Sequence, residues 1–312
     1  MPRIAIVTDS TACLPAELVK RLGIRVVPLR VVIKGESFSE ADPGTARLLI
    51  EALRRHETAT TSGPSPEEFA AAYRAAAQAG ASGIVSLHIS GELSATAESA
   101  ELAAKDAPVP VWVVDSRTVA MALGFAAIAA AEAGAGAAGD CAAGDCAAGD
   151  CAARDNTADL DRVARLAADR SAAASALFYV DTLEFLRRGG RIGSARALLG
   201  SALAMKPLLH IVDGRVEPLE KVRTSAKAIA RLAEIAVERA SKSAADGIAV
   251  EVAVQHLDAP ARASQLAARL RERLPEVGEI TVCEVGAVIG AHVGPGVLGV
   301  IVSPRVASCR HL

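Results

Sequence analysis

The chain has 312 residues, a length that predicts two domains and a core large enough to contain an apolar cavity. Aromatic residues make up 3% of the chain and the formal net charge is -2, so neither a nucleic-acid-binding surface nor attraction to an anionic membrane is expected. The longest apolar stretch, Val119 to Ala131, is shorter than the about 20 residues that span a bilayer, so we expect a buried helix and no integral membrane segment. No export signal precedes the six cysteines, so we expect reduced thiols and a cytoplasmic location.

Apolar runs alternate with helical segments in the first part of the chain, residues 1–172. Strands are predicted at 4–7, 24–33, 83–89 and 109–114. Helices are predicted from Pro15 to Gly23, at 46–55 and 66–79, from the end of the 90–94 loop to Ala104, and after Arg117. Residues 60–66 are predicted to form a loop. This alternation predicts a Rossmann-like α/β domain whose parallel sheet binds ligands at the carboxyl ends of its strands.

Residues 134–153 interrupt this pattern with a low-complexity segment. The unit Gly-Asp-Cys-Ala-Ala recurs every five residues and supplies Cys141, Cys146 and Cys151. Two four-residue gaps between cysteines are not a zinc spacing, and no histidine lies among them, although the aspartates offer oxygen ligands. We interpret the segment as a surface insertion and predict no metal site.

The second part, residues 173–312, is predicted to be an α+β domain. Strands are expected at 176–180, 248–256, 280–285 and 299–302, and a hairpin at 208–212 and 215–222 around Asp213 and Gly214. Helices are expected at 183–188, 194–204, 225–240 and 260–274, and residues 286–296 are predicted to form a glycine-rich loop. The change from alternating elements to hairpins places the domain boundary near residue 172.

Small hydroxyl residues gather at three predicted junctions between strands and helices. These are residues 8–11, 61–65 and 90–96. Such junctions offer free backbone N–H groups and hydroxyl donors to an anion, although each group alone is more often an ordinary helix cap. His292 lies among glycines that allow close approach to a ligand, but a single histidine is more often structural. Arg191 follows two glycines that could simply end a helix.

Several common catalytic patterns are absent from the sequence. No dinucleotide-binding glycine motif follows the first strand, and no phosphate-binding P-loop, nucleophile elbow or zinc-protease motif occurs. Asp9, Glu92 and Asp115 lie near the hydroxyl-rich loops but form no evident acid–base pair. The residues therefore favour a binding protein over an enzyme.

The order of the motifs resembles that of the DegV family. The resemblance covers nearly the whole chain except residues 134–153 and the tail after Pro304, and its motifs are specific only when taken together. They are Thr8-Asp9-Ser10-Thr11, Leu14-Pro15, Pro28-Leu29, Thr61-Ser62-Gly63-Pro64-Ser65-Pro66, Leu93-Ser94-Ala95-Thr96, Val114-Asp115-Ser116-Arg117, Asp181-Thr182-Leu183-Glu184-Phe185-Leu186, Gly190-Arg191-Ile192, Lys206-Pro207, Arg223-Thr224 and residues 290–296.

This resemblance implies a protein that binds a long-chain fatty acid between its two domains. The bound acid would be presented to a separate kinase subunit, which phosphorylates the carboxylate to an acyl-phosphate for phospholipid metabolism. The chain itself would be a non-catalytic subunit of this fatty-acid kinase, with no cofactor besides the bound acid. Two alternatives are a lipid sensor or transporter without a kinase partner and, less favoured, an enzyme acting on a small phosphorylated metabolite.

The resemblance also assigns roles to individual residues. Thr61 and Ser94 match the hydroxyl donors to the carboxylate, with Ser62 beside them, and His292 matches a histidine next to the head group. Arg191 matches an arginine linked to phosphoryl transfer or kinase docking.

Two further features concern the surroundings of the head group. The resemblance places Asp9 and Ser10 in its vicinity. Ala95 departs from the family pattern, which has glycine there, and puts the geometry of this loop in question.

Overall fold

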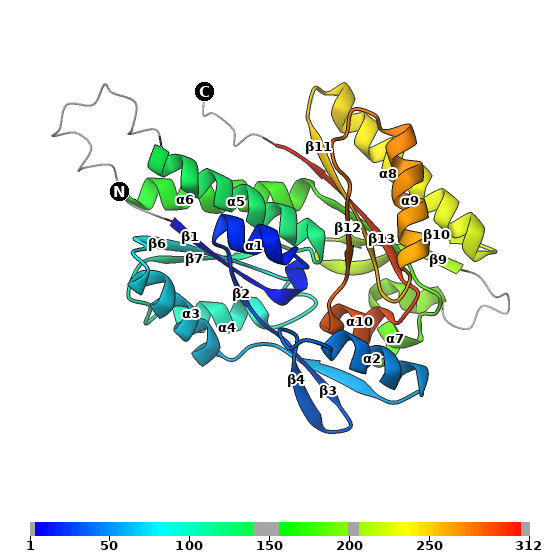
Figure 1. Cartoon of the computed structure of the whole chain (residues 1–312), viewed down its shortest axis with the longest axis horizontal. Coiled ribbons are helices and arrows are strands. Elements are labelled where there is room, and N and C mark those ends of the chain that lie inside the picture. The colour runs from blue at the N-terminus through cyan, green and yellow to red at the C-terminus, as the bar shows by residue number, and fades with distance from the viewer. Residues whose placement is uncertain (1–3, 140–155, 199–205, 307–312) are drawn as a thin grey trace.

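The structure is a computed structural model that describes residues 4–139, 156–198 and 206–306. Two sheets lie side by side, each packed against helices, and a small third sheet lies along the lower edge of the view in Figure 1. The repeat cysteines Cys141, Cys146 and Cys151 lie outside the described residues, as does most of the predicted insertion. No helix in the described ranges is long and apolar enough to cross a membrane.

The first sheet is parallel, as the alternating pattern predicts. Its strand order is β2-β1-β6-β7, formed by Arg25–Val27, Ile4–Asp9, Gly83–His88 and Val111–Asp115. Helices α5 (Met121–Gly139) and α6 (Asn156–Ala173) pack against one face, and α3 (Pro66–Gln78) and α4 (Thr96–Ala104) pack against the other. The helix α1 (Ala16–Leu22) lies against α5. The Rossmann-like α/β prediction is confirmed.

The second sheet is mixed and contains six strands in the order β10-β9-β8-β13-β11-β12. They span Arg215–Val222, Lys206–Val212, Ser175–Tyr179, Leu298–Pro304, Val250–His256 and Thr281–Glu284. Helices α8 (Ser225–Ala245) and α9 (Pro260–Arg273) cover its outer face. The hairpin of β9 and β10 and the α+β character are as predicted. All six strands lie after residue 172, but the domain boundary itself stays a prediction.

The prediction of one extended segment over residues 24–33 is wrong. The chain leaves the parallel sheet after β2 and enters a three-stranded antiparallel sheet as β3 (Arg30–Ile33), with β4 (Glu36–Ser39) on one side. Pro28 lacks the N–H that would continue a strand, and the N–H of Leu29 donates to Ser10 Oγ at 2.9 Å instead.

The predicted loop at residues 60–66 is also partly wrong. Its first residues belong to β5 (Ala59–Ser62), which pairs with β3 and completes the order β4-β3-β5. Threonines suit a strand once a partner is available, and that partner lies some thirty residues earlier in the chain. The helix α2 (Thr45–Arg54) connects the hairpin to β5.

The glycine-rich segment 286–296 is predicted as a loop but contains the helix α10 (Ala287–Val293). Its internal Gly290 allows close packing, because a Cβ there would lie 2.9 Å from Leu257 and 3.0 Å from Leu49. Helix α7 (Glu184–Arg188) matches its prediction. The helix predicted over residues 194–204 is a short 3-10 helix, Gly193–Leu198, where it is described, and residues 199–204 lie outside the described part.

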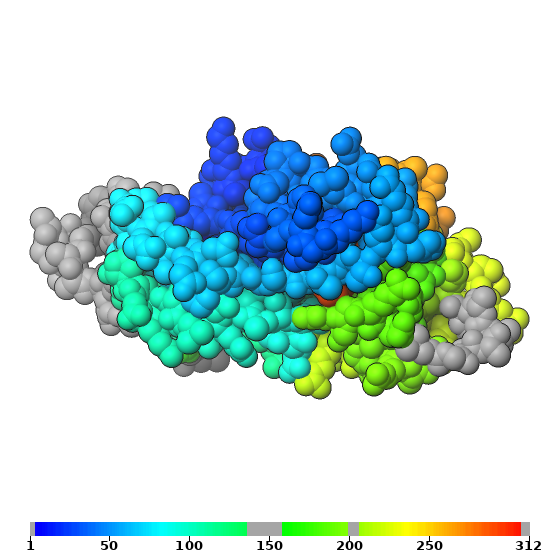
Figure 2. All heavy atoms as spheres, turned by 90° about the horizontal axis from the view of Figure 1, so that it is seen from below, coloured from blue at the N-terminus to red at the C-terminus, as the bar shows by residue number. Residues whose placement is uncertain are grey.

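Helix α10 from the last part of the chain packs against elements from the first part. Its buried residues form one apolar cluster with β3 and α2, from Leu29, Val31 and Leu49 to Val288 and Ala291. Seen from below, the blue segment with the small sheet and the green segment with α7 meet and leave little of the red C-terminal segment visible on this face (Figure 2). The strands of the third sheet come from the first part of the chain, but they pack against α10 from the second part.

Candidate ligand-binding cavity

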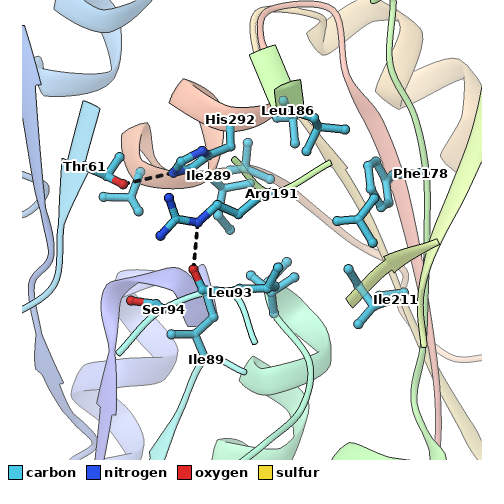
Figure 3. A pocket seen from close by; sticks show the side chains of 18 of the residues that line it. Thr61, Ile89, Leu93, Ser94, Phe178, Leu186, Arg191, Ile211, Ile289 and His292 are labelled. Atoms are coloured by element: carbon cyan, nitrogen blue, oxygen red, sulfur yellow. Dashed lines mark hydrogen bonds between the residues drawn. The ribbon is translucent and has the colours of Figure 1, made fainter. Parts of the chain in front are cut away.

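A cavity of about 290 Å³ lies between the inner face of the six-stranded sheet and the loops at the carboxyl ends of the parallel strands. Most of its wall is aliphatic, with Ile89 and Leu93 from the parallel-sheet side and Ile211 and Ile301 from the other sheet. Phe178 adds an aromatic ring to this wall (Figure 3). A largely apolar hollow with few polar groups is typical of a ligand-binding site.

Five residues singled out from the sequence lie together at the polar end of this cavity. They are Thr61 and Ser62 on β5, Ser94 in the loop before α4, Arg191 after α7, and His292 on α10. Figure 3 shows the side chains of Thr61, Arg191 and His292 converging there, with Ser94 on the opposite side of the guanidinium group. Elements more than two hundred residues apart in the chain therefore build one polar end.

The central contact of this end joins Thr61 and His292. Thr61 Oγ1 lies 2.9 Å from His292 Nε2, whereas His292 Nδ1 is buried and has no hydrogen-bond partner. Burial, with a contribution from the nearby Arg191 charge, lowers the pKa of His292 to about 4, so its ring is neutral near pH 7.

The unpartnered nitrogen decides where the single ring proton lies. A buried N–H without an acceptor costs more than a buried lone pair without a donor, so the proton belongs on Nε2. Nε2–H then donates to Thr61 Oγ1. The Thr61 hydroxyl proton is left to donate to a ligand at the cavity's polar end.

Glycines and small side chains shape the same end. A Cβ on Gly189 would lie 2.1 Å from His292 Nδ1, so the backbone there packs directly against the imidazole ring. On the other side, Ser94 Oγ lies 2.8 Å from Thr96 Oγ1. Ala95 between them has a φ of -73°, which any residue adopts, so glycine is not required by the backbone at this position.

Arg191 is the only charged side chain in the described lining of the cavity. Its Nε donates to the carbonyl oxygen of Leu93 at 3.0 Å and its Nη1 to that of Gly189 at 2.7 Å. Within the described ranges it has no carboxylate partner within salt-bridge distance, unlike Arg215, which pairs with Glu92. Its guanidinium thus contributes uncompensated positive charge, and its place beside the hydroxyl groups was missed when the sequence was interpreted.

Asp9 and Ser10, which the resemblance places near the head group, are not part of the cavity wall. Asp9 is fully buried, lies 3.1 Å from His88 Nδ1 and accepts a hydrogen bond of 3.0 Å from the N–H of Ile89. Ser10 accepts from the N–H of Leu29. Because Ile89 and Leu29 line the cavity, both polar residues hold its wall from behind.

No cluster of residues suited to hold a metal ion occurs in the described ranges. The polar end offers hydroxyl and guanidinium groups, which are donors to an anion, and its described lining holds no carboxylate that would bind a hard cation. The arrangement suits an amphipathic molecule with an anionic head and an apolar tail.

The fold and the cavity together define an α/β protein whose two larger sheets enclose an apolar cavity with a positively charged, hydroxyl-lined end. The DegV family model, which carries the description of an uncharacterised protein family, matches residues 3–139 and 141–305. The chain therefore belongs to the DegV family. A DegV domain-containing protein of Streptomyces coelicolor is 54% identical over 97% of this chain and 99% of its own length. Protein DegV of Bacillus subtilis is 35% identical over 95% and 98%, respectively.

Solved structures show the same fold. One, described as showing fatty acid binding of a DegV family protein from Thermus thermophilus, has a TM-score of 0.80 and 36% identity and covers 97% of this chain and 99% of its own. Another, described as DegV, a fatty acid binding protein from Bacillus subtilis, has a TM-score of 0.81 and 32% identity, with coverage of 97% and 100%.

Proposed function

We propose that this protein binds a long-chain fatty acid in the cavity, with the carboxylate at Thr61, Ser94, Arg191 and His292. One observation carries the proposal: the apolar cavity has a single charged lining residue, a cation without an acidic partner in the described ranges. An unpaired cation at the end of an apolar cavity favours a ligand that brings both a negative charge and a hydrocarbon chain. The fatty-acid-binding descriptions of two solved relatives support the same ligand class.

The tail supplies most of the affinity in this proposal. Each buried methylene contributes about 0.8 kcal/mol, so a chain of about 15 contributes roughly 12 kcal/mol before the costs of ordering the chain. The polar end then sets orientation. The hydroxyls of Thr61 and Ser94 donate to the carboxylate, Arg191 supplies the charge, and the neutral His292 holds the Thr61 oxygen from behind.

The finer part of the proposal is that the bound acid is presented to a separate kinase and converted to an acyl-phosphate. Neutral hydroxyl donors withdraw less charge from a carboxylate than a bidentate guanidinium pair does, which keeps an oxygen nucleophilic. Arg191 already uses its Nε and Nη1 on backbone carbonyls. A second hollow of about 230 Å³ shares Thr61, Arg191 and His292 with the cavity and extends to the exposed Thr60 and Arg188, which supports access to the head group from outside.

Native mass spectrometry of the purified protein, followed by extraction and identification of the lipid, tests the binding step. The expected result is one fatty acid per chain, with a mass shift that disappears on delipidation and returns on adding the free acid. A protein that carries no lipid and takes up no fatty acid contradicts the proposal.

The kinase step needs a separate assay with a bacterial fatty-acid kinase catalytic subunit and ATP. Acyl-phosphate formation is expected with wild type and is expected to fall strongly in a Thr61→Val, Ser94→Ala double variant. Asp115 lies outside the cavity lining, and its carboxylate accepts a hydrogen bond from the N–H of Arg117. The Asp115→Asn variant therefore serves as the control. Fatty-acid binding without acyl-phosphate formation would favour a lipid sensor or transporter.

A further inference from the structure

The floor of the cavity is the inner face of the six-stranded sheet, and β13 runs through its middle. Side chains alternate along this strand. Leu298, Val300 and Val302 belong to the apolar core under α8 and α9, whereas Gly299 and Ile301 line the cavity. Gly299 therefore lies on the ligand side of a central strand.

Nothing in the backbone requires glycine at this position. Gly299 is not among the residues with positive φ, and a Cβ there would have its nearest neighbours at 3.6 Å from the Leu177 carbonyl oxygen, 3.8 Å from Gln255 and 3.9 Å from Phe178. These are ordinary contact distances, so a side chain would project into the cavity without a clash. By contrast, a Cβ on Gly193 would lie 2.1 Å from the Val216 carbonyl oxygen.

Glycine in the interior of a strand weakens the strand, because the backbone loses more freedom on folding and no side chain packs. At Gly299 the missing side chain leaves a trough in the face of the sheet that lines the cavity. Phe178 on β8 and Gln255 on β11 are its direct neighbours in register. They lie two strand spacings apart, about 9.6 Å, so their side chains flank a groove about one hydrocarbon chain wide.

The trough leads away from the polar end toward buried side chains of β13 and α5. Ile301, the next residue of β13 on this face, packs in a buried cluster with Met121 of α5. The N–H of Met121 also donates a 3.0 Å hydrogen bond to Gln255 Oε1, which fixes the side-chain amide of Gln255 next to Met121. A chain anchored at His292 and running over Gly299 therefore meets its limit near Ile301 and Gln255.

We propose that Gly299 determines the length of the hydrocarbon chain that this protein accepts, by keeping open the trough between Phe178 and Gln255. The inference rests on the proposed function of fatty-acid binding and adds a specificity residue to it. A side chain at position 299 occupies the space of the inner methylenes, so it shortens the accepted chain and leaves the carboxylate end as it is.

The test measures dissociation constants of delipidated wild type, Gly299→Ala and Gly299→Leu for saturated fatty acids from decanoic to stearic acid. Each methylene excluded from the cavity lowers affinity about four-fold. For stearic acid we expect a loss of about four-fold in Gly299→Ala and of up to about 200-fold in Gly299→Leu, with decanoic acid binding unchanged. The Thr61→Val variant is the head-group control and is expected to weaken all chain lengths by the same factor.

Two results would overturn the inference while leaving fatty-acid binding intact. One is a chain-length profile of Gly299→Leu and Gly299→Ala that equals that of wild type or is lowered uniformly. The other is a clear loss of thermal stability in ligand-free Gly299→Ala, which would mean that protein atoms already fill the trough; the expected midpoint is equal to or above that of wild type. Wild type that binds no fatty acid of any length would refute the proposed function itself.

Discussion

Substituting Gly189 with alanine tests whether His292 holds the Thr61 hydroxyl in place. The backbone at Gly189 has φ -73° and ψ -7°, values that alanine adopts without strain, so the change acts only through the added methyl group. That Cβ would lie 2.1 Å from His292 Nδ1 and 2.8 Å from Cε1, far inside contact distance. The ring must therefore turn or shift, which removes its 2.9 Å contact with Thr61 Oγ1.

The contact between His292 and Thr61 exists before any ligand binds, so its loss weakens binding only through the Thr61 hydroxyl that it holds in place. A hydroxyl no longer aimed at the carboxylate loses a hydrogen bond to a charged acceptor, which contributes about 1.5 to 3 kcal/mol. The dissociation constant for a fatty acid should therefore rise about ten-fold to 150-fold. Fluorescence displacement of a bound fatty-acid analogue measures this directly on delipidated protein.

The neighbouring glycine provides a matched control. Gly190 has φ +72°, and no atom lies within 4 Å of where its Cβ would be. Gly190→Ala is therefore expected to lower stability by about 1 kcal/mol through backbone strain while leaving affinity unchanged. Gly189→Ala should also add nothing to a His292→Ala variant, since both act on the same contact. An affinity loss that is additive in the double variant, or equal in both glycine variants, would refute this reasoning.

Three other changes have defined outcomes. Arg191→Gln removes the only charged group in the described lining, so fatty-acid affinity should fall at least ten-fold, while affinity for the matching fatty alcohol, measured in the same assay, should change little. The pKa of His292 is lowered to about 4 in the folded state, which then binds fewer protons than the unfolded chain, so stability should fall by about 3 kcal/mol as pH drops from 6.5 to 4. Urea unfolding at several pH values should show this fall in wild type and not in His292→Gln. Burial raises the pKa of Glu40, so the folded state keeps the carboxyl proton to higher pH than the unfolded chain, and stability should fall as pH rises above 4.5. The Glu40→Gln variant still accepts from the N–H of Val288 and should remove this fall in the same urea-unfolding series.

Much of the framework follows from local sequence alone. The strand β1 (Ile4–Asp9) and the strand β6 (Gly83–His88) are apolar runs buried on both faces, a pattern that depends little on what packs against it. The helix α3 carries its own start signal, with Ser65 and Glu68 forming a capping box around Pro66. Such elements are predictable because each one's own residues specify it.

Elements specified by distant partners were not predicted. The strand β5 is polar and short, and only its pairing with β3 distinguishes it from a loop. The helix α10 contains Gly290, which disfavours a helix locally but allows Leu49 and Leu257 to approach it closely. Tertiary packing outweighs local propensity in both cases.

The polar end was predictable as a set of residues but not as a geometry. Thr61 and His292 are 231 positions apart, and only a family resemblance associates them before a structure is available. The same resemblance assigned Arg191 to transfer or docking, and that role stays a prediction; its hydrogen bonds to backbone carbonyls place it beside the hydroxyl groups of the cavity. The sequence indicated only a helix end at Gly189, because its contact with the imidazole ring of His292 depends on a distant part of the chain.

The position of His292 depends on packing that crosses the predicted domain boundary. Leu49 from the first part of the chain and Ala291 from the second lie in one apolar cluster, and Glu40 Oε1 accepts a 2.7 Å hydrogen bond from the N–H of Val288 at the start of α10. These contacts hold α10 against β5, and so bring Nε2 within reach of the Thr61 hydroxyl. The ligand cavity therefore couples the two parts of the chain: in the proposed function, a fatty acid seated on both sheets adds its own buried surface to an interface that already includes the residues proposed to bind its head group.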